Sequence, residues 1–206
     1  MIKSPIYKQL DETGSILIRT NLPHNQPLPE SIQKEFARCT VFYAAMLRAI
    51  SAINNPRTGQ PYSIYNYHVT ESILLGSNKF VKVSEDITTI RAHRFLRDLN
   101  KRLYSQLFNI NLRKKESRKI SSILTGLSKE AIRMIEANND EEFKIGFITF
   151  IVEYINGFLN ISVRSVYINS GDYKKSSKRE RRRRIFRIKT PWRLQTESYL
   201  FITNVT

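Results

Sequence analysis

The amino-acid sequence predicts an α+β protein: a central group of about three helices packed on antiparallel strands and hairpins, with a basic C-terminal segment. Apolar residues recur at helical spacing in the middle of the chain, runs rich in β-branched and aromatic residues lie at both ends, and Asn156-Gly157 is a strong hairpin signal. The length of 206 residues suits one ordinary domain. We therefore expect residues 1–173 to form a single domain, residues 174–189 a basic segment, and residues 190–206 a C-terminal strand that completes the domain.

The first part of the chain predicts a strand, a long helix and then further strands. Residues 15–20 form a short apolar run typical of a strand, and a proline-rich loop follows. From residue 30 to about 53 apolar residues recur at helical spacing, and Asn54-Asn55-Pro56 should end this helix. Residues 57–83 are rich in tyrosine, isoleucine and valine, which favours strands with a short turn at Gly76-Ser77-Asn78.

A second helix is expected over residues 85–109, capped by Ser84. On a helical wheel one side of this segment is apolar and the other is a basic stripe. An ordinary solvated face mixes acidic and basic residues, so a basic stripe broken only by Asp98 favours contact with nucleic acid over simple solvation. The predicted contacts in the stripe and in the connection after it are Arg91, Arg94, Arg97, Lys101, Arg102, Arg113, Lys114 and Lys115.

A third helix is expected over about residues 117–138, and the stretch after it admits two interpretations. Folding about Asn156-Gly157 gives a hairpin that places Val152 opposite Ile161. The alternative is a helix over residues 141–156, because the aromatic residues there also fit helical spacing. The high content of Ile, Val, Phe and Thr favours the hairpin.

The charge balance is the unusual property of this sequence. Lys and Arg number 34 against 18 Asp and Glu, which gives a net charge of +16. Residues 174–189 alone hold ten basic residues and one acidic residue, Glu180. Such an excess indicates a polyanionic partner, with nucleic acid first and an anionic membrane surface second.

Repulsion between consecutive arginines predicts that the basic segment is poorly ordered until a partner neutralises it. A break at Pro191-Trp192 and a closing strand over residues 198–206 should follow. The segment would then be a loop or strand edge, tethered at both ends over a groove, although a solvated run or a nuclear-localisation signal is also compatible. The predicted phosphate contacts here are Lys178, Arg179, Arg181, Arg182, Arg183, Arg184, Arg187 and Lys189.

These features favour a non-catalytic nucleic-acid-binding protein that acts in a ribonucleoprotein or viral-type assembly with protein partners. Arginines close to Tyr62, Tyr65 and Tyr67 suit unpaired bases, so RNA or a single strand is preferred to duplex DNA, although core packing is the ordinary role of such tyrosines. One alternative is a metal-independent endoribonuclease with His68 or His93 as general acid or base. A further alternative is a peripheral matrix-like protein on anionic membrane.

Few residues suggest a cofactor or a metal ion. The sequence lacks glycine-rich phosphate loops and Cys/His spacings for zinc, so we expect neither cofactor nor metal. Glu142-Phe143-Lys144 matches half of a metal-dependent nuclease pattern, but a partner aspartate is missing from a preceding strand. The single cysteine, Cys39, and the lack of a signal-like N-terminus predict an intracellular protein, cytoplasmic or nuclear and not secreted.

Overall fold

The structure is a computed structural model, and it describes residues 6–10, 16–23, 26–93, 95, 125–127, 129–136, 142–185 and 188–202. Over these residues the chain has the mixed α+β architecture that the sequence predicts. The strands form a six-stranded sheet in the order β1-β2-β4-β5-β6-β3. Neighbouring strands are antiparallel except β2 and β4, which are parallel.

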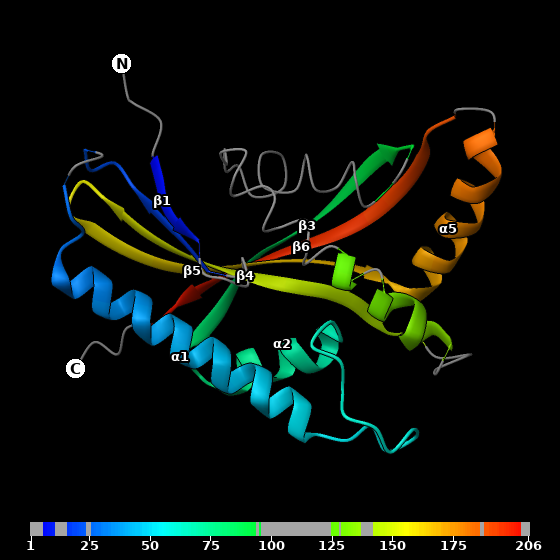
Figure 1. Cartoon of the computed structure of the whole chain (residues 1–206), viewed down its shortest axis with the longest axis horizontal. Helices are drawn as coiled ribbons and strands as arrows, with labels where there is room; N and C mark the ends of the chain where they lie inside the picture. Colours follow the sequence, from blue (N-terminus) through cyan, green and yellow to red (C-terminus); the bar gives the residue numbers. More distant parts are fainter. Residues whose placement is uncertain are drawn as a thin grey trace.

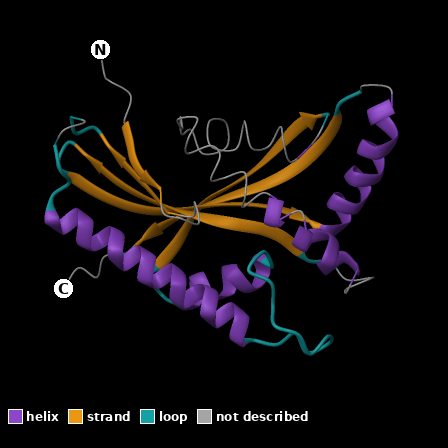
Figure 2. Ribbon diagram, in the orientation of Figure 1, coloured by secondary structure: helices purple, strands orange, loops and turns teal. Residues whose placement is uncertain are grey.

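The elements follow one another in an order that returns the chain repeatedly to this sheet (Figure 1). Helices α1 and α2 lie against one face of the sheet, and α5 lies at one end of it (Figure 2). Residues 125–127 and 129–136 are also helical. The bounds are β1 Ile6–Leu10, β2 Ile16–Thr20, α1 Glu30–Ala52, α2 Tyr67–Gly76, β3 Phe80–Ala92, β4 Lys144–Ile155, β5 Phe158–Asn169, α5 Ser170–Ile185 and β6 Thr190–Phe201.

The β4–β5 hairpin confirms the prediction from Asn156-Gly157 and excludes the alternative helix. Val152 pairs with Ile161 in the predicted register. Asn156 has a φ of 54° and Gly157 a φ of 84°. A two-residue type I′ turn requires positive φ at both central positions, and Asn-Gly provides them at the lowest cost.

Apolar side chains cover both faces of the sheet around β4, whereas most of β3 is exposed. On one face Tyr43 and Ile50 of α1 and Leu74 of α2 pack against Phe150 of β4. On the other face Trp192 of β6 packs with residues that include Phe95, Leu127 and Ala131. Burial on both faces explains why β4 is apolar almost throughout, a pattern that period-two alternation does not reveal.

The prediction of strands over residues 57–83 is wrong for residues 67–76, which form helix α2. Asn66 caps this helix with its side-chain oxygen, which accepts a backbone N–H at 3.3 Å. Tyr67, Thr70 and Leu74 then share one buried face. Asn78, with a φ of 55°, turns the chain from α2 into β3, so the expected turn at residues 76–78 ends a helix instead of joining two strands. The strand expected from residue 80 is present.

The helix expected over residues 85–109 is wrong for residues 85–92, which belong to β3, whereas residue 95 is helical. Strand β3 continues through Ser84 to Ala92 and pairs with β6 along its length, with one shift of register between Lys82 and Ser84. Ile87-Thr88-Thr89-Ile90 is a β-branched run, and this local preference agrees with the strand. Residues 94 and 96–109 lie outside the described residues, as do 117–124 of the third predicted helix, which is helical at 125–127 and 129–136.

The C-terminal elements differ from the prediction in two places. The basic segment is helical from Ser170 to Ile185, where a loop or strand edge was expected. Strand β6 begins at Thr190, so Pro191-Trp192 starts the strand instead of interrupting it. Proline is tolerated at the first residues of a strand because fewer ladder hydrogen bonds are needed there. Among the described residues, none of the helices is long and apolar enough to span a membrane.

Candidate functional site

Helix α5 is attached to the rest of the protein at its start, middle and end. Ser170 donates its backbone N–H to the carbonyl of Phe143 at 2.8 Å, and its hydroxyl accepts the Phe143 N–H at 3.1 Å. Ser176 donates its hydroxyl to a β6 carbonyl at 3.3 Å. The guanidinium of Arg183 donates to the carbonyl of Lys189 at 3.2 Å. The helix therefore has a defined inner face.

Two further contacts on this inner face involve an aromatic stack. The Tyr173 ring meets Trp192 edge-on, with ring centroids 5.6 Å apart. Trp192 stacks on Phe95 at 4.0 Å with an angle of 11°. Glu180, the one acidic residue of the basic segment, accepts the backbone N–H of Phe95 at 3.0 Å. The acidic residue therefore points inward, toward the body of the protein.

The charged side chains on the outer face of α5 are all basic, and Asp172 of the first turn lies just outside this face. On a helical wheel of 100° per residue, the six basic side chains that define this face span an arc of about 160° on the side of the helix opposite Tyr173. Five of these six residues, all except Lys174, are exposed, and no acidic residue falls within the arc. A solvated helix would ordinarily mix the two signs. We define the outer face of α5 as Lys174, Lys175, Lys178, Arg179, Arg181 and Arg182.

The structure places Lys189 near the end of α5, among the predicted phosphate contacts, but it places Arg91 elsewhere. Lys189 is exposed just beyond the end of α5. Arg91 pairs with Pro191 in the β3–β6 ladder, but it lies between Ile90 and Ala92, which both belong to the core on the α5 side. Because successive side chains of a strand point to opposite faces, Arg91 leaves the sheet on the face away from α5.

Arg183 is half-buried and donates to the Lys189 carbonyl, and Arg184 lies in the last turn of α5. The remaining predicted contacts lie outside the described residues. They are Arg94, Arg97, Lys101, Arg102, Arg113, Lys114, Lys115 and Arg187.

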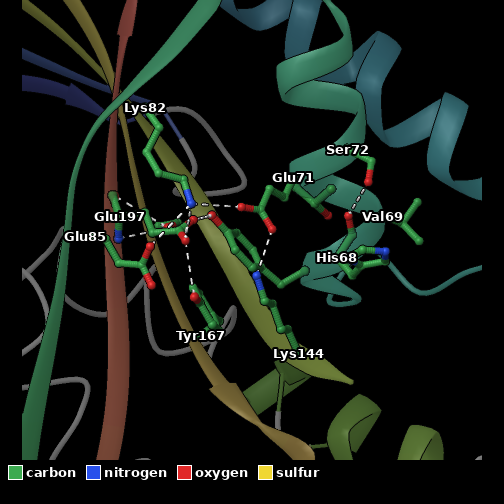
Figure 3. Close-up of polar contacts among 12 residues, drawn as sticks. His68, Val69, Glu71, Ser72, Lys82, Glu85, Lys144, Tyr167 and Glu197 are labelled. Atoms are coloured by element: carbon green, nitrogen blue, oxygen red, sulfur yellow. Dashed lines mark hydrogen bonds and ion pairs between the residues drawn. The ribbon is translucent and has the colours of Figure 1, made fainter. Parts of the chain in front are cut away.

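A network of charged and tyrosine side chains lies on the α2 side of the sheet (Figure 3). Its centre is Glu197, a carboxylate with 1% of its surface exposed. Tyr67 donates to Glu197 Oε2 at 2.5 Å, and Tyr199 donates to the same oxygen. Lys82 Nζ and the Tyr167 hydroxyl donate to Oε1 at 2.7 and 3.2 Å. Both carboxylate oxygens are therefore satisfied, as burial of a charge requires.

The network continues outward from Glu197 through alternating charges. Lys82 also donates to Glu71 at 3.2 Å, and Glu71 accepts in turn from Lys144 at 2.9 Å. The Lys144 ammonium lies 4.8 Å from the centre of the Tyr167 ring. Five elements, α2, β3, β4, β5 and β6, supply these side chains, so the network ties α2 to the sheet.

The pKa values in the network follow from burial and these hydrogen bonds. Burial would raise the pKa of Glu197, but donation from Lys82, Tyr199 and Tyr67 outweighs it and lowers the pKa below the ordinary glutamate value. Burial and the Glu197 carboxylate raise the pKa of Tyr67, Tyr167 and Tyr199 well above the ordinary tyrosine value. Burial would lower the pKa of Lys82, but its two carboxylate partners raise it.

A hollow of about 600 Å³ opens beside the outer end of this network. It lies between the α1–α2 connection, the first turn of α2 and the beginning of β4. Its volume falls in the range of small-ligand sites. The side chains with functional groups or rings in its lining include Arg57, Tyr62, His68, Glu142, Phe143 and Lys144.

The walls of the hollow are held by backbone hydrogen bonds. The side chain of Asn55 accepts the N–H of Arg57 at 2.9 Å, and the Tyr62 N–H donates to the Ile53 carbonyl at 3.0 Å. Beyond the lining residues, the Gly146 N–H donates to the Tyr65 carbonyl at 3.0 Å and joins the α1–α2 connection to β4. The hollow is thus formed by ordered backbone.

The structure separates the two candidate histidines. His68 is exposed in the first turn of α2 and lines the hollow, whereas His93 follows β3 and is not part of that lining. Glu142 and Lys144, the matched residues of the nuclease-like pattern, both line the hollow. Within the described residues, no group of three or more His, Cys, Asp or Glu side chains could hold a metal ion.

Sequence reasoning missed the network around Glu197. Its members are spread over residues 67 to 199 and follow no spacing, so only tertiary pairing brings them together. The one signal was the Glu142-Phe143-Lys144 pattern, which lies at the outer edge of the network and in the hollow. The sequence shows the tyrosine cluster, but Tyr67 is fully buried and stacks on Tyr167, with ring centroids 4.5 Å apart.

Comparisons with known proteins give only distant similarities. No family model matches the chain, and no curated protein matches it significantly. The chain is similar to the activated Cyt2Ba monomer from Bacillus thuringiensis subsp. israelensis, with a TM-score of 0.33 and 7% identity over 82% of this chain and 93% of that one. It is also similar to the Evf virulence factor, with a TM-score of 0.38 and 10% identity over 85% of this chain and 69% of that one.

Proposed function

We propose that the protein binds nucleic acid without catalysis, through phosphate contacts on the outer face of α5, in a ribonucleoprotein or viral-type assembly. One observation carries the proposal: basic side chains occupy this face without any acidic residue, while Glu180 is turned inward to Phe95. The positive charge is thus concentrated on the side of the helix that a large partner can reach.

The chemistry of the face suits phosphates. Lys175, Lys178 and Arg182 succeed one another by about one helical turn, and Arg179 lies beside them. Arginine can donate two parallel hydrogen bonds to a phosphate, and lysine adds point charge. Because α5 is attached at both ends, less conformational entropy is lost on binding than for a disordered basic tail.

The preference for RNA or a single strand depends on aromatic residues that can reach an unpaired base, and burial removes Tyr67 from this group. Tyr67 is fully buried and cannot stack on a base. Tyr62 is half-buried and lines the hollow, so it is the tyrosine of this cluster that could meet an unpaired base. We therefore propose RNA or another single strand before duplex DNA.

Salt-dependent binding tests the proposal. Filter binding of single-stranded RNA, single-stranded DNA and duplex DNA is measured across a series of salt concentrations. Contact with six phosphates gives a log–log slope of about −4 on single strands and about −5 on a duplex. A slope near −1 on all three would contradict a phosphate-binding face.

One observation favours a second candidate, metal-independent RNA cleavage. His68 lines the same hollow as Lys144 and Arg57, and such groups can transfer a proton and stabilise a developing phosphorane. Structured RNA is incubated with the protein in EDTA. Cleavage that is lost in His68→Ala supports this activity, and intact RNA dismisses it.

A further inference from the structure

The hollow beside α2 combines the chemical groups that one nucleotide requires. Arg57 and Lys144 are cationic donors for a phosphate, and the exposed His68 adds a ring nitrogen. Glu142 can accept hydrogen bonds from ribose hydroxyls, as acidic residues do in dinucleotide sites. Tyr62 and Phe143 offer aromatic surface to a base.

The charge of Lys144 is partly balanced by Glu71 of the network. Its ammonium donates to Glu71, which also accepts from Lys82, so one carboxylate faces two ammonium groups. An ammonium has three donors, and the bond to Glu71 uses one of them. The hollow therefore suits one phosphate group better than several.

The hollow borders the start of α5. Phe143 of its lining exchanges two hydrogen bonds with Ser170, the first residue of the helix. Asn169, the preceding residue, also lines the hollow. Lys174 and Lys175, where the outer face begins, follow at about 6 to 8 Å along the helix axis. A strand bound along α5 could therefore place its end in the hollow.

We propose that this hollow binds a nucleoside monophosphate group, either as a free nucleotide or as the unpaired, 5′-phosphorylated end of a strand held by α5. Arg57 and Lys144 bind the phosphate, Glu142 the ribose, and Tyr62 or Phe143 contacts the base. Binding of a strand end rests on the proposed function, whereas binding of a free nucleotide does not.

Calorimetric titration with AMP and UMP tests this site directly. The wild-type protein should bind both at one saturable site. Arg57→Ala should weaken binding about tenfold, since it removes a charge-assisted contact, and His68→Ala should also weaken it. Arg48→Ala, which removes an exposed arginine of α1, is the matched control and should change binding less than about twofold. No saturable binding by the wild type, or equal binding by Arg57→Ala, overturns the proposal.

A second set of ligands separates the two sources of the nucleotide. Short single strands with a 5′-phosphate or a 5′-hydroxyl and a blunt duplex are compared on wild type and Arg57→Ala. A strand end in the hollow predicts that Arg57→Ala weakens only the 5′-phosphorylated strand. If Arg57→Ala weakens AMP but none of the oligonucleotides, the hollow binds free nucleotide. If AMP binds but no oligonucleotide does, the proposed function fails while the hollow stands.

Discussion

Glu180 of α5 accepts the backbone N–H of Phe95 at 3.0 Å. The one acidic residue of the basic segment, which has ten basic residues, therefore contacts the body of the protein. The Phe95 ring stacks on Trp192, which in turn meets Tyr173 of the same helix. This arrangement links α5 to the end of β3 and to β6. It also leaves the outer face of α5 with a single sign of charge.

Replacement of Glu180 should therefore loosen α5. Glu180→Ala removes the acceptor for the Phe95 N–H, at a cost of about 1 to 3 kcal/mol. We expect hydrogen exchange of the amides in residues 170–185 to accelerate about tenfold or more. Arg179→Ala, a change in the same helix on its outer face, is the control and should leave exchange nearly unchanged. Equal exchange in both variants would show that Glu180 does not hold the helix.

Removal of the charge of Glu197 should destabilise the fold strongly. Glu197→Gln leaves Lys82 without its buried partner and disturbs the acceptors of Tyr67 and Tyr199. Breaking a buried pair of this kind costs about 3 to 5 kcal/mol in the free energy of unfolding. Glu30→Gln, in an exposed pair with Lys34, should cost about 0.5 kcal/mol or less. Urea unfolding of the two variants measures the difference, and similar losses would contradict a structural role for the network.

Alkaline pH should unfold the protein in concert with ionisation of the buried tyrosines. The folded-state pKa values of Tyr67, Tyr167, Tyr199 and Lys82 are raised, so their contribution to stability is complete below about pH 10 and is lost as the pH rises above it. Tyrosinate absorbance and circular dichroism are followed together. We expect part of the tyrosine absorbance to appear only as the fold is lost; titration of all ten tyrosines near pH 10 in the folded protein would contradict this.

Acid should act on the same network through Glu197. Its folded-state pKa is lowered, so the stability it contributes is present above about pH 4 and is lost as the pH falls below that value. Thermal unfolding measured from pH 3 to pH 7 should show a smaller acid-induced loss in Glu197→Gln than in the wild type. An identical pH dependence of the two proteins would show that Glu197 has an ordinary pKa.

Gly146 of β4 should tolerate no side chain. A Cβ there would lie 2.5 Å from the Tyr167 Cβ and against the Val166 carbonyl oxygen, both on the paired strand β5. Backbone cannot yield easily, so Gly146→Ala should cost about 3 kcal/mol. Gly76→Ala, at the end of α2 in open space, should be neutral or slightly stabilising. Thermal unfolding of both variants provides the comparison, and equal midpoints would contradict the close approach.

Local signals predicted the parts of the fold that depend on local interactions. The Asn156-Gly157 turn and the long helix α1 were predicted because turn geometry and helical periodicity act over a few residues. Strand β3 was mistaken for a helix beyond Ser84 because its pairing with β6, more than 100 residues away, decides its structure. Helix α2 was missed because its tyrosine-rich composition favours strands, whereas its cap at Asn66 and its buried face decide in favour of a helix.

In the candidate site, too, composition predicted the basic segment, whereas tertiary contacts decide how its residues are arranged. The basic segment was evident from composition alone, but its helical form, and with it the separation of outer and inner residues, depends on contacts with Phe95 and β6. Arg91 was placed on the same surface by the helical wheel, and strand alternation puts it on the other face of the sheet. The Glu197 network and the hollow require five elements to meet, which no local pattern reports.

The most direct test of the account compares salt dependence in two variants that each lose three charges. Lys178→Gln/Arg179→Gln/Arg182→Gln alters the outer face of α5, and Lys34→Gln/Arg38→Gln/Arg48→Gln alters exposed positions of α1 on the other side of the sheet. For single-stranded RNA the α5 variant should lower the magnitude of the log–log slope by about 2, and the α1 variant should match the wild type. Equal slopes in all three proteins, or equal losses in both variants, would contradict a phosphate-binding face on α5.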